Sequence, residues 1–163
     1  ISFSTDPYNN TIRIDLGSTD GIEENMAVVS PLGLVGRVSR VAPFYSTVEL
    51  ITNMDPGNAE SNAISATVRG KEDASFGIID TYDREANVLI MSKIELEDPL
   101  AVGDIVVTSG FGGIYPPGIT IGTVLSRETK KFGTITHTAE IRPAADFSPL
   151  RLREVFVVEV PKP

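Results

Sequence analysis

Residues 108–124 read Thr-Ser-Gly-Phe-Gly-Gly-Ile-Tyr-Pro-Pro-Gly-Ile-Thr-Ile-Gly-Thr-Val, with five glycines and two prolines in seventeen residues. Glycine tolerates positive φ and close backbone approach, while a Pro-Pro pair fixes φ and removes two amide donors. We therefore predict a loop of defined shape in place of a flexible tether. Its expected structural residues are Gly110, Gly112, Gly113, Pro116, Pro117 and Gly118.

The same loop carries bulky side chains that a solvated loop does not need, and an earlier turn beside Pro43 carries two more. Such side chains can close the open ends of small β-barrels. They can equally contact a partner protein, because a turn exposes a side chain without disturbing a strand. The candidate contact residues are Phe111, Ile114, Tyr115, Phe44 and Tyr45.

Apolar and polar residues alternate in several segments, most strictly over Thr11-Ile12-Arg13-Ile14-Asp15-Leu16. This alternation is typical of a strand with one buried face. No segment combines an apolar period of three to four residues with caps at both ends, so we expect little helix. The predicted strands are residues 11–16, 26–29, 34–41, 47–51, 63–68, 75–80, 87–96, 104–108, 119–127, 132–141 and 152–160.

A weak internal repeat relates the two halves of the chain. Residues 26–30 followed by Gly36 resemble residues 100–108 followed by Gly122, and the eight extra residues of the second copy lie in the glycine-rich loop. Short strands repeated twice predict an all-β fold of two small six-stranded β-barrels, or a sandwich of related halves. We expect the first barrel at 1–62 and the second at 63–163. Whether the hairpin 63–80 or the final strand 152–160 joins the first barrel stays open.

The charged residues and the cysteine content indicate which partners and sites are improbable for this chain. The net charge is −8, from 22 acidic against 14 basic residues, and the longest basic cluster is Lys130-Lys131. Nucleic acid and anionic membrane surfaces are therefore poor candidates for a direct partner. The chain has no cysteine, which excludes thiolate catalysis and zinc-thiolate sites. The acidic groups, including Glu95, Glu97 and Asp98, do not have the spacing of a calcium loop, and we interpret them as solvated surface.

A two-barrel protein with Ser-Gly in a glycine-rich loop invites comparison with chymotrypsin-like proteases, in which a serine needs a histidine base and an orienting acid. Here Ser109 precedes the only histidine, His137, whereas that protease class places its histidine first, and Thr108 stands directly before the serine in place of the aspartate of the protease motif. Alternation places His137 on an apolar strand face, as expected for a core or barrel-end histidine. We predict no catalytic, metal or cofactor residues, and we keep a two-barrel hydrolase or a peptidoglycan-binding module as alternative functions.

Several blocks of the sequence stand in a characteristic order: residues 12–17, 33–38, 46–52 and above all 103–110, continuing through Pro116, Gly118 and Gly122. Together they resemble the extracytoplasmic domain of the rod shape-determining protein family MreC. The resemblance implies two β-barrels outside the bacterial membrane, preceded by a membrane helix and a coiled coil that this sequence lacks. It also implies a non-enzymatic scaffold that self-associates and contacts penicillin-binding proteins and other membrane components that build the lateral cell wall.

Overall fold

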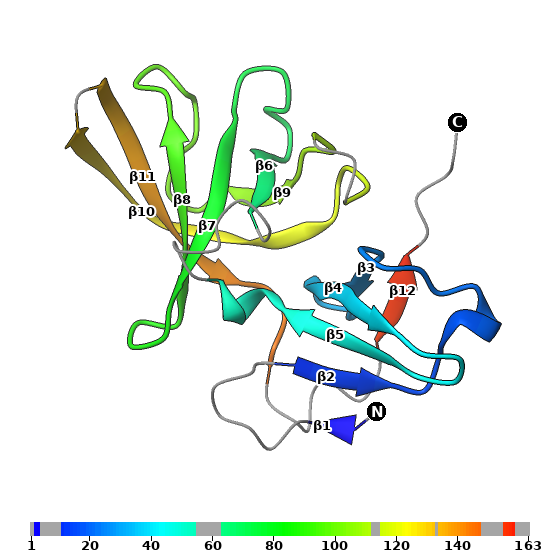
Figure 1. Ribbon diagram of the computed structural model, residues 1–163. Helices are drawn as coiled ribbons and strands as arrows, with labels where there is room; N and C mark the ends of the chain where they lie inside the picture. Colours follow the sequence, from blue (N-terminus) through cyan, green and yellow to red (C-terminus); the bar gives the residue numbers. More distant parts are fainter. Residues whose placement is uncertain are drawn as a thin grey trace. The chain divides into compact units, whose positions relative to one another are not determined.

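A computed structural model describes residues 2–3, 11–54, 63–111, 115–132, 134–147 and 155–158 of the chain (Figure 1). These residues are almost entirely β, with two short 3-10 helices, η1 (Ser18–Asp20) and η2 (Ile51–Asn53), so the predicted all-β class is confirmed. Among them, no helix is long and apolar enough to cross a bilayer. The chain divides into two compact units, the first comprising Ile1–Asn53 with Ala145–Pro163 and the second comprising Met54–Ala144.

The first unit contains a six-stranded antiparallel sheet in the order β1-β2-β5-β4-β3-β12. Alternation brings Ile12 and Ile14 of β2 and Val48 and Leu50 of β5 into one core, and burying each such side chain contributes about 1.5–3 kcal/mol. The C-terminal strand β12, whose membership the sequence left open, pairs with β3. The strands are β1 (Ser2–Phe3), β2 (Thr11–Ile14), β3 (Ala27–Val29), β4 (Leu34–Val41), β5 (Ser46–Leu50) and β12 (Phe156–Val158).

The second unit is a closed six-stranded barrel in the order β10-β11-β8-β7-β6-β9, in which every neighbouring pair is antiparallel. Its strands are β6 (Ile64–Val68), β7 (Gly77–Asp83), β8 (Val88–Ile94), β9 (Ile105–Thr108), β10 (Thr120–Phe132) and β11 (Thr134–Pro143). Each strand therefore has two neighbours in the barrel order, and bulges in β7, β8 and β10 bend the strands around the barrel. Its fully buried side chains include Ile64, Ile79, Leu89, Met91, Ile94, Ile121 and Ile141.

Two glycines give the predicted repeat a physical basis. Gly36 lies where β4 pairs with β3, and Gly122 lies where β10 pairs with β9. A Cβ at Gly36 would lie 2.1 Å from the carbonyl oxygen of Glu49, and one at Gly122 would lie 2.0 Å from that of Arg142. Both contacts are with backbone, which cannot move aside cheaply. Glycine is therefore required at the equivalent point of each unit because three strands approach closely there.

Candidate functional site

A groove of about 760 Å³ lies in the second unit, between the connection from β6 to β7 and the glycine-rich loop after β9. Thr67 of β6 and Val107 of β9 face each other across the strand pairing and both line the groove. Groove-like surfaces with apolar linings are the usual form of binding sites on otherwise polar proteins. This is the candidate functional site.

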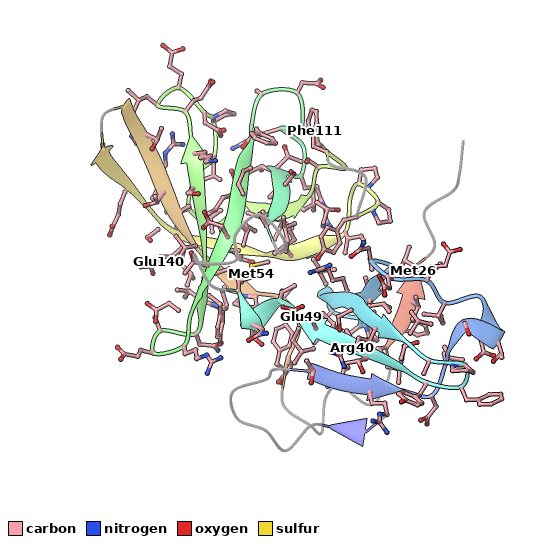
Figure 2. All side chains as sticks on the ribbon, in the orientation of Figure 1. Met26, Arg40, Glu49, Met54, Phe111 and Glu140 are labelled. Carbon is pink, nitrogen blue, oxygen red and sulfur yellow. The ribbon has the colours of Figure 1, made fainter. Side chains whose placement is uncertain are left out.

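Two phenylalanines from different loops meet at the groove. Phe76 and Phe111 pack edge to face, with ring centroids 5.6 Å apart and an interplanar angle of 84°. They remain 39% and 72% exposed, respectively, and Figure 2 shows Phe111 on the connection that leaves β9. Such a pair stabilises the approach of the two loops by about 0.5–1.5 kcal/mol. It still leaves a large apolar surface facing solvent, which is typical of a contact site.

A buried carboxylate holds Phe76 in place. Asp98 Oδ1 accepts hydrogen bonds from Ser75 Oγ at 2.7 Å and Leu100 N at 2.9 Å, while its Oδ2 accepts from Phe76 N at 2.9 Å. Thr67 Oγ1 also donates to the Ser75 carbonyl at 2.7 Å. Asp98 is buried, which corrects its assignment to solvated surface, whereas its neighbours at 95 and 97 are exposed. Three donors satisfy the carboxylate inside the fold, so it positions the groove wall.

The base of the glycine-rich loop is fixed from the opposite side. Thr108 Oγ1 donates to the Pro116 carbonyl at 2.6 Å, and the Thr108 carbonyl accepts from Gly118 N at 2.9 Å. Gly110 has φ of +85°, which favours glycine, and a Cβ there would lie 3.1 Å from the Pro117 ring. These contacts give the described part of the loop a defined shape and hold the segment that carries Phe111.

The remaining candidate residues of this loop differ in accessibility. Tyr115 is only 8% exposed, which agrees better with the alternative in which these side chains close a barrel end, and it offers little surface to a partner. Ile114, Gly112 and Gly113 lie outside the described residues. Phe111 is thus the accessible aromatic side chain on the described part of the loop. Its partner Phe76 lies within the predicted strand 75–80 and was not among the candidate contact residues, because nothing in the sequence distinguishes it from other strand residues.

The other two candidate residues belong to the first unit. Phe44 is 75% exposed on the connection between β4 and β5, and Tyr45 beside it is also exposed. The Arg13 guanidinium lies 4.3 Å from the centre of the Tyr45 ring, a cation–π contact. Thr19 Oγ1 donates to the Pro43 carbonyl at 2.7 Å and anchors the turn. These aromatics therefore form a second exposed surface, separate in sequence and fold from the groove.

The groove has an acidic rim. Glu72 and Asp73 line it, are exposed and, among the described residues, form no ion pair. Lys71 next to them is engaged elsewhere, because its Nζ lies 2.8 Å from Asp104 Oδ2. Burial alone would raise the pKa of Asp104, but hydrogen bonds from Lys71 and from the Ala101 amide, with the Lys71 charge, hold that pKa below its ordinary value. The negative charge at the rim is left uncompensated.

The protease comparison finds no support in the hydrogen bonds of Ser109 and His137. Ser109 Oγ accepts from the Phe111 amide at 3.3 Å, whereas His137 Nδ1 accepts from Arg127 Nε at 2.5 Å. A serine protease needs its histidine bonded to the serine and to an acid, and these described contacts provide neither. His137 is half-buried at the end of the β11–β8 pairing, two residues before the buried Ala139.

Arg127 completes this polar network. Its other N–H groups donate to backbone carbonyls of the connection from β8 to β9, namely those of Glu95, Leu96, Asp98 and Leu100. Every guanidinium donor thus has an acceptor, which indicates a structural role. Within the residues that the structure describes, no group of three acidic or histidine side chains is arranged to hold a metal ion.

Comparison with known proteins connects this fold to a family. Residues 1–159 match the family model for the rod shape-determining protein MreC, barrel core. The cell shape-determining protein MreC of Listeria monocytogenes is 42% identical over 146 residues, which are 90% of this chain and 48% of that protein. The Bacillus subtilis protein of the same name is 34% identical over 167 residues, covering 99% and 56%. The chain spans about half the length of these curated relatives.

Solved structures agree with this match. MreC from Listeria monocytogenes superposes with a TM-score of 0.79 at 41% identity, covering 90% of this chain and 68% of that one. The major periplasmic domain from the cell shape-determining filament MreC gives 0.77 at 28% identity, covering 95% and 88%. MreC in a complex with PBP2 from Helicobacter pylori gives 0.71 at 22% identity, covering 96% and 90%, a likeness of fold. With nearly its whole length matched, the chain belongs to the MreC family of rod shape-determining proteins.

Proposed function

We propose that this chain is the extracytoplasmic part of a non-enzymatic scaffold for bacterial cell elongation. The scaffold organises peptidoglycan synthases for growth of the lateral wall and so maintains rod shape. In the full-length protein, an N-terminal helix anchors it to the cell membrane. Membership of a cell shape-determining family supports this role, and so does a relative described as a periplasmic domain.

The partners in this proposal are penicillin-binding proteins, other membrane components of elongation and further copies of the chain. A protein of the same fold from Helicobacter pylori forms a complex with PBP2, and a 28% identical relative is described as a filament. The groove offers the means of contact: its exposed Phe76–Phe111 pair is carried by loops that hydrogen bonds hold in place. This exposed aromatic pair is the observation that carries the proposal.

The test is capture of a class B penicillin-binding protein ectodomain by the immobilised chain. Replacing Phe76 and Phe111 with alanine removes the aromatic surface, and buried aromatic anchors commonly contribute more than 1 kcal/mol each to an interface. We expect at least a roughly tenfold loss of affinity. Phe44→Ala is the matched control, because Phe44 is equally exposed but lies in the first unit.

Circular dichroism must show that all three proteins are folded before their affinities are compared. Equal capture by the wild-type and the double variant would remove the groove from the contact surface. Loss of capture by Phe44→Ala alone would move the contact to the first unit. A folded wild-type chain that captures no penicillin-binding protein ectodomain would contradict the partner class itself.

A further inference from the structure

The chain's only histidine makes a contact that fixes its protonation state. His137 Nδ1 accepts a hydrogen bond from Arg127 Nε at 2.5 Å, and both side chains are half-buried. A guanidinium has five N–H donors and no acceptor, so Nδ1 must offer a lone pair. The contact therefore requires the neutral imidazole with its proton on Nε2. A protonated imidazole donates from both nitrogens, and this hydrogen bond cannot form with it.

Among the described residues, Arg127 is the charged group that is hydrogen-bonded to His137. Across the strand pairings, His137 lies opposite Thr129 of β10 and Ile94 of β8, neither of which titrates. The connection from β8 to β9 carries Asp98, whose carboxylate is bonded to the groove wall. The remaining charged residues on the adjoining segments of β8, β10 and this connection are Lys93, Glu95, Glu97, Glu128, Lys130 and Lys131. Protonation of His137 therefore places its new charge directly against a permanent cation.

Arg127 has no spare donor with which to adapt to that charge. Its Nη1 and Nη2 donate to four backbone carbonyls of the connection from β8 to β9, at distances of 2.6–3.2 Å. Protonation of His137 removes the acceptor of Nε and sets two positive charges in contact, which repel strongly in a partly buried site. A guanidinium that withdraws from the imidazole also withdraws from these carbonyls. The charge on His137 thus decides whether residues 95–100 keep their side-chain donor.

The same connection positions the groove wall. Arg127 Nη1 donates to the Asp98 carbonyl, and the Asp98 carboxylate accepts from Phe76 N and from Leu100 N, both at 2.9 Å. Arg127 therefore holds Asp98 through its backbone, while Asp98 holds Phe76 through its side chain. Loss of the Arg127 contacts frees the backbone at Asp98, and the Phe76 amide loses part of its restraint. An unbroken series of hydrogen bonds thus connects His137 to the aromatic wall of the groove.

We propose that protonation of His137 loosens the Phe76 wall of the groove, so that the chain binds its partner more weakly at mildly acid pH than at neutral pH. This regulation rests on the proposed function, in which the groove is the contact surface of an extracytoplasmic domain. Histidine is the side chain whose charge ordinarily changes between pH 5 and 8, and a domain outside the membrane is exposed to the pH of the surroundings. By linkage, bound partner in turn opposes the protonation of His137.

A pH titration of the chain by NMR tests this coupling directly. Because the chain has one histidine, its imidazole signals report the protonation of His137 without ambiguity. Between about pH 8 and pH 5, we expect the amide signals of Phe76 and Leu100 to shift with the same midpoint as the imidazole. Protection against amide hydrogen exchange, corrected for the pH dependence of the intrinsic exchange rate, should fall roughly threefold or more over residues 95–100 below that midpoint.

The matched control is His137→Asn, whose amide oxygen can accept from Arg127 Nε but takes up no proton in this pH range. Capture of the penicillin-binding protein ectodomain is compared for wild type and His137→Asn at about pH 7.5 and pH 5.5, so that effects of pH on the partner cancel. We expect the wild-type affinity to fall about fivefold relative to that of the variant, which is a modest coupling between two sites.

The outcomes separate this regulation from the broader function. Imidazole titration that leaves the Phe76 and Leu100 amides unchanged overturns the proposal, and so does an imidazole that takes up no proton down to about pH 5. Equal loss of capture by wild type and His137→Asn at acid pH also overturns it, while the partnership stands. A chain that captures no ectodomain at neutral pH contradicts the proposed function alone, because the NMR titration still decides whether His137 controls the groove wall.

Discussion

Replacing Asp98 with alanine should destabilise the second unit more than any change at its exposed neighbours. The carboxylate accepts three hydrogen bonds, two of them from the backbone amides of Phe76 and Leu100. Alanine leaves both amides without this acceptor, the Leu100 amide in a buried position and the Phe76 amide in a partly buried one, at about 1–3 kcal/mol each. Because effects within one network are not additive, we expect a total loss of about 3 kcal/mol.

This loss is large relative to the unit. A unit of 91 residues, counted from Met54 to Ala144, has a free energy of unfolding of roughly 5–14 kcal/mol at 0.05–0.15 kcal/mol per residue. For a domain of this size, about 3 kcal/mol lowers the melting temperature by roughly 12–24 °C. Urea unfolding and thermal melts, both followed by far-UV circular dichroism, measure the two quantities.

Glu97→Ala is the internal control for this prediction. Glu97 is also acidic and lies one residue from Asp98, but it is exposed, so its removal should change the free energy of unfolding by less than about 0.5 kcal/mol. Asp98→Asn should be intermediate, because its amide retains one acceptor oxygen. An Asp98→Ala variant as stable as Glu97→Ala would refute the claim that a buried carboxylate positions the groove wall.

Three further predictions address the barrel. Gly122→Ala should lower the free energy of unfolding by about 3 kcal/mol, because the added Cβ would clash with the backbone of Arg142. Gly77→Ala should lower it by only about 1 kcal/mol in the same urea titration, because the Cβ there would approach the flexible side chain of Met91. The pKa of Asp104 is lower in the folded chain than its ordinary value of 3.8, so the ionised carboxylate stabilises the fold above that pH, and this stabilisation is lost as the pH falls through the folded-state pKa. The difference in free energy of unfolding between wild type and Asp104→Asn should therefore shrink below about pH 4, as urea titrations at several pH values would measure. Arg127→Met should destabilise the barrel by about 2 kcal/mol and speed amide hydrogen exchange over residues 95–100, because the carbonyls there lose their donors. Arg127→Lys should not restore the protection, since an ammonium cannot reproduce the five donors of a guanidinium. Unchanged exchange in Arg127→Met would contradict this prediction.

Strands with one buried face could be predicted from the sequence because burial imposes alternation. The predicted strand 34–41 has the same bounds as β4 in the structure, and the predicted strand 11–16 contains β2. Strand β10 was predicted to end at 127 but continues to Phe132. The missed residues 128–131 pair only with β11, and Glu128 and Thr129 are exposed, so these two positions carry no apolar residue that would mark a strand. The repeat pattern also identified the positions of Gly36 and Gly122, where backbone crowding restricts the residue type.

The groove could be predicted only in part. The glycine-rich loop drew attention to Phe111, but the pairing of that ring with Phe76 depends on a contact across 35 residues of sequence. Asp98 resembles its exposed acidic neighbours in sequence, and only the fold brings Ser75 and Phe76 to its carboxylate. The extra residue of β8 opposite His137 and Ala139 was not predicted, because simple alternation gives no sign of a bulge. Which side chains come together at the groove therefore depends on long-range contacts and local irregularities, which the periodicity of the sequence does not reveal.

The most direct test of the groove as a contact surface is amide hydrogen exchange on the chain, alone and with a class B penicillin-binding protein ectodomain. We expect added protection at residues 72–76 and 107–111, which line or flank the groove, and little change around Phe44 and Tyr45. Protection confined to the first unit, or a bound complex with no change at the groove, would contradict the account.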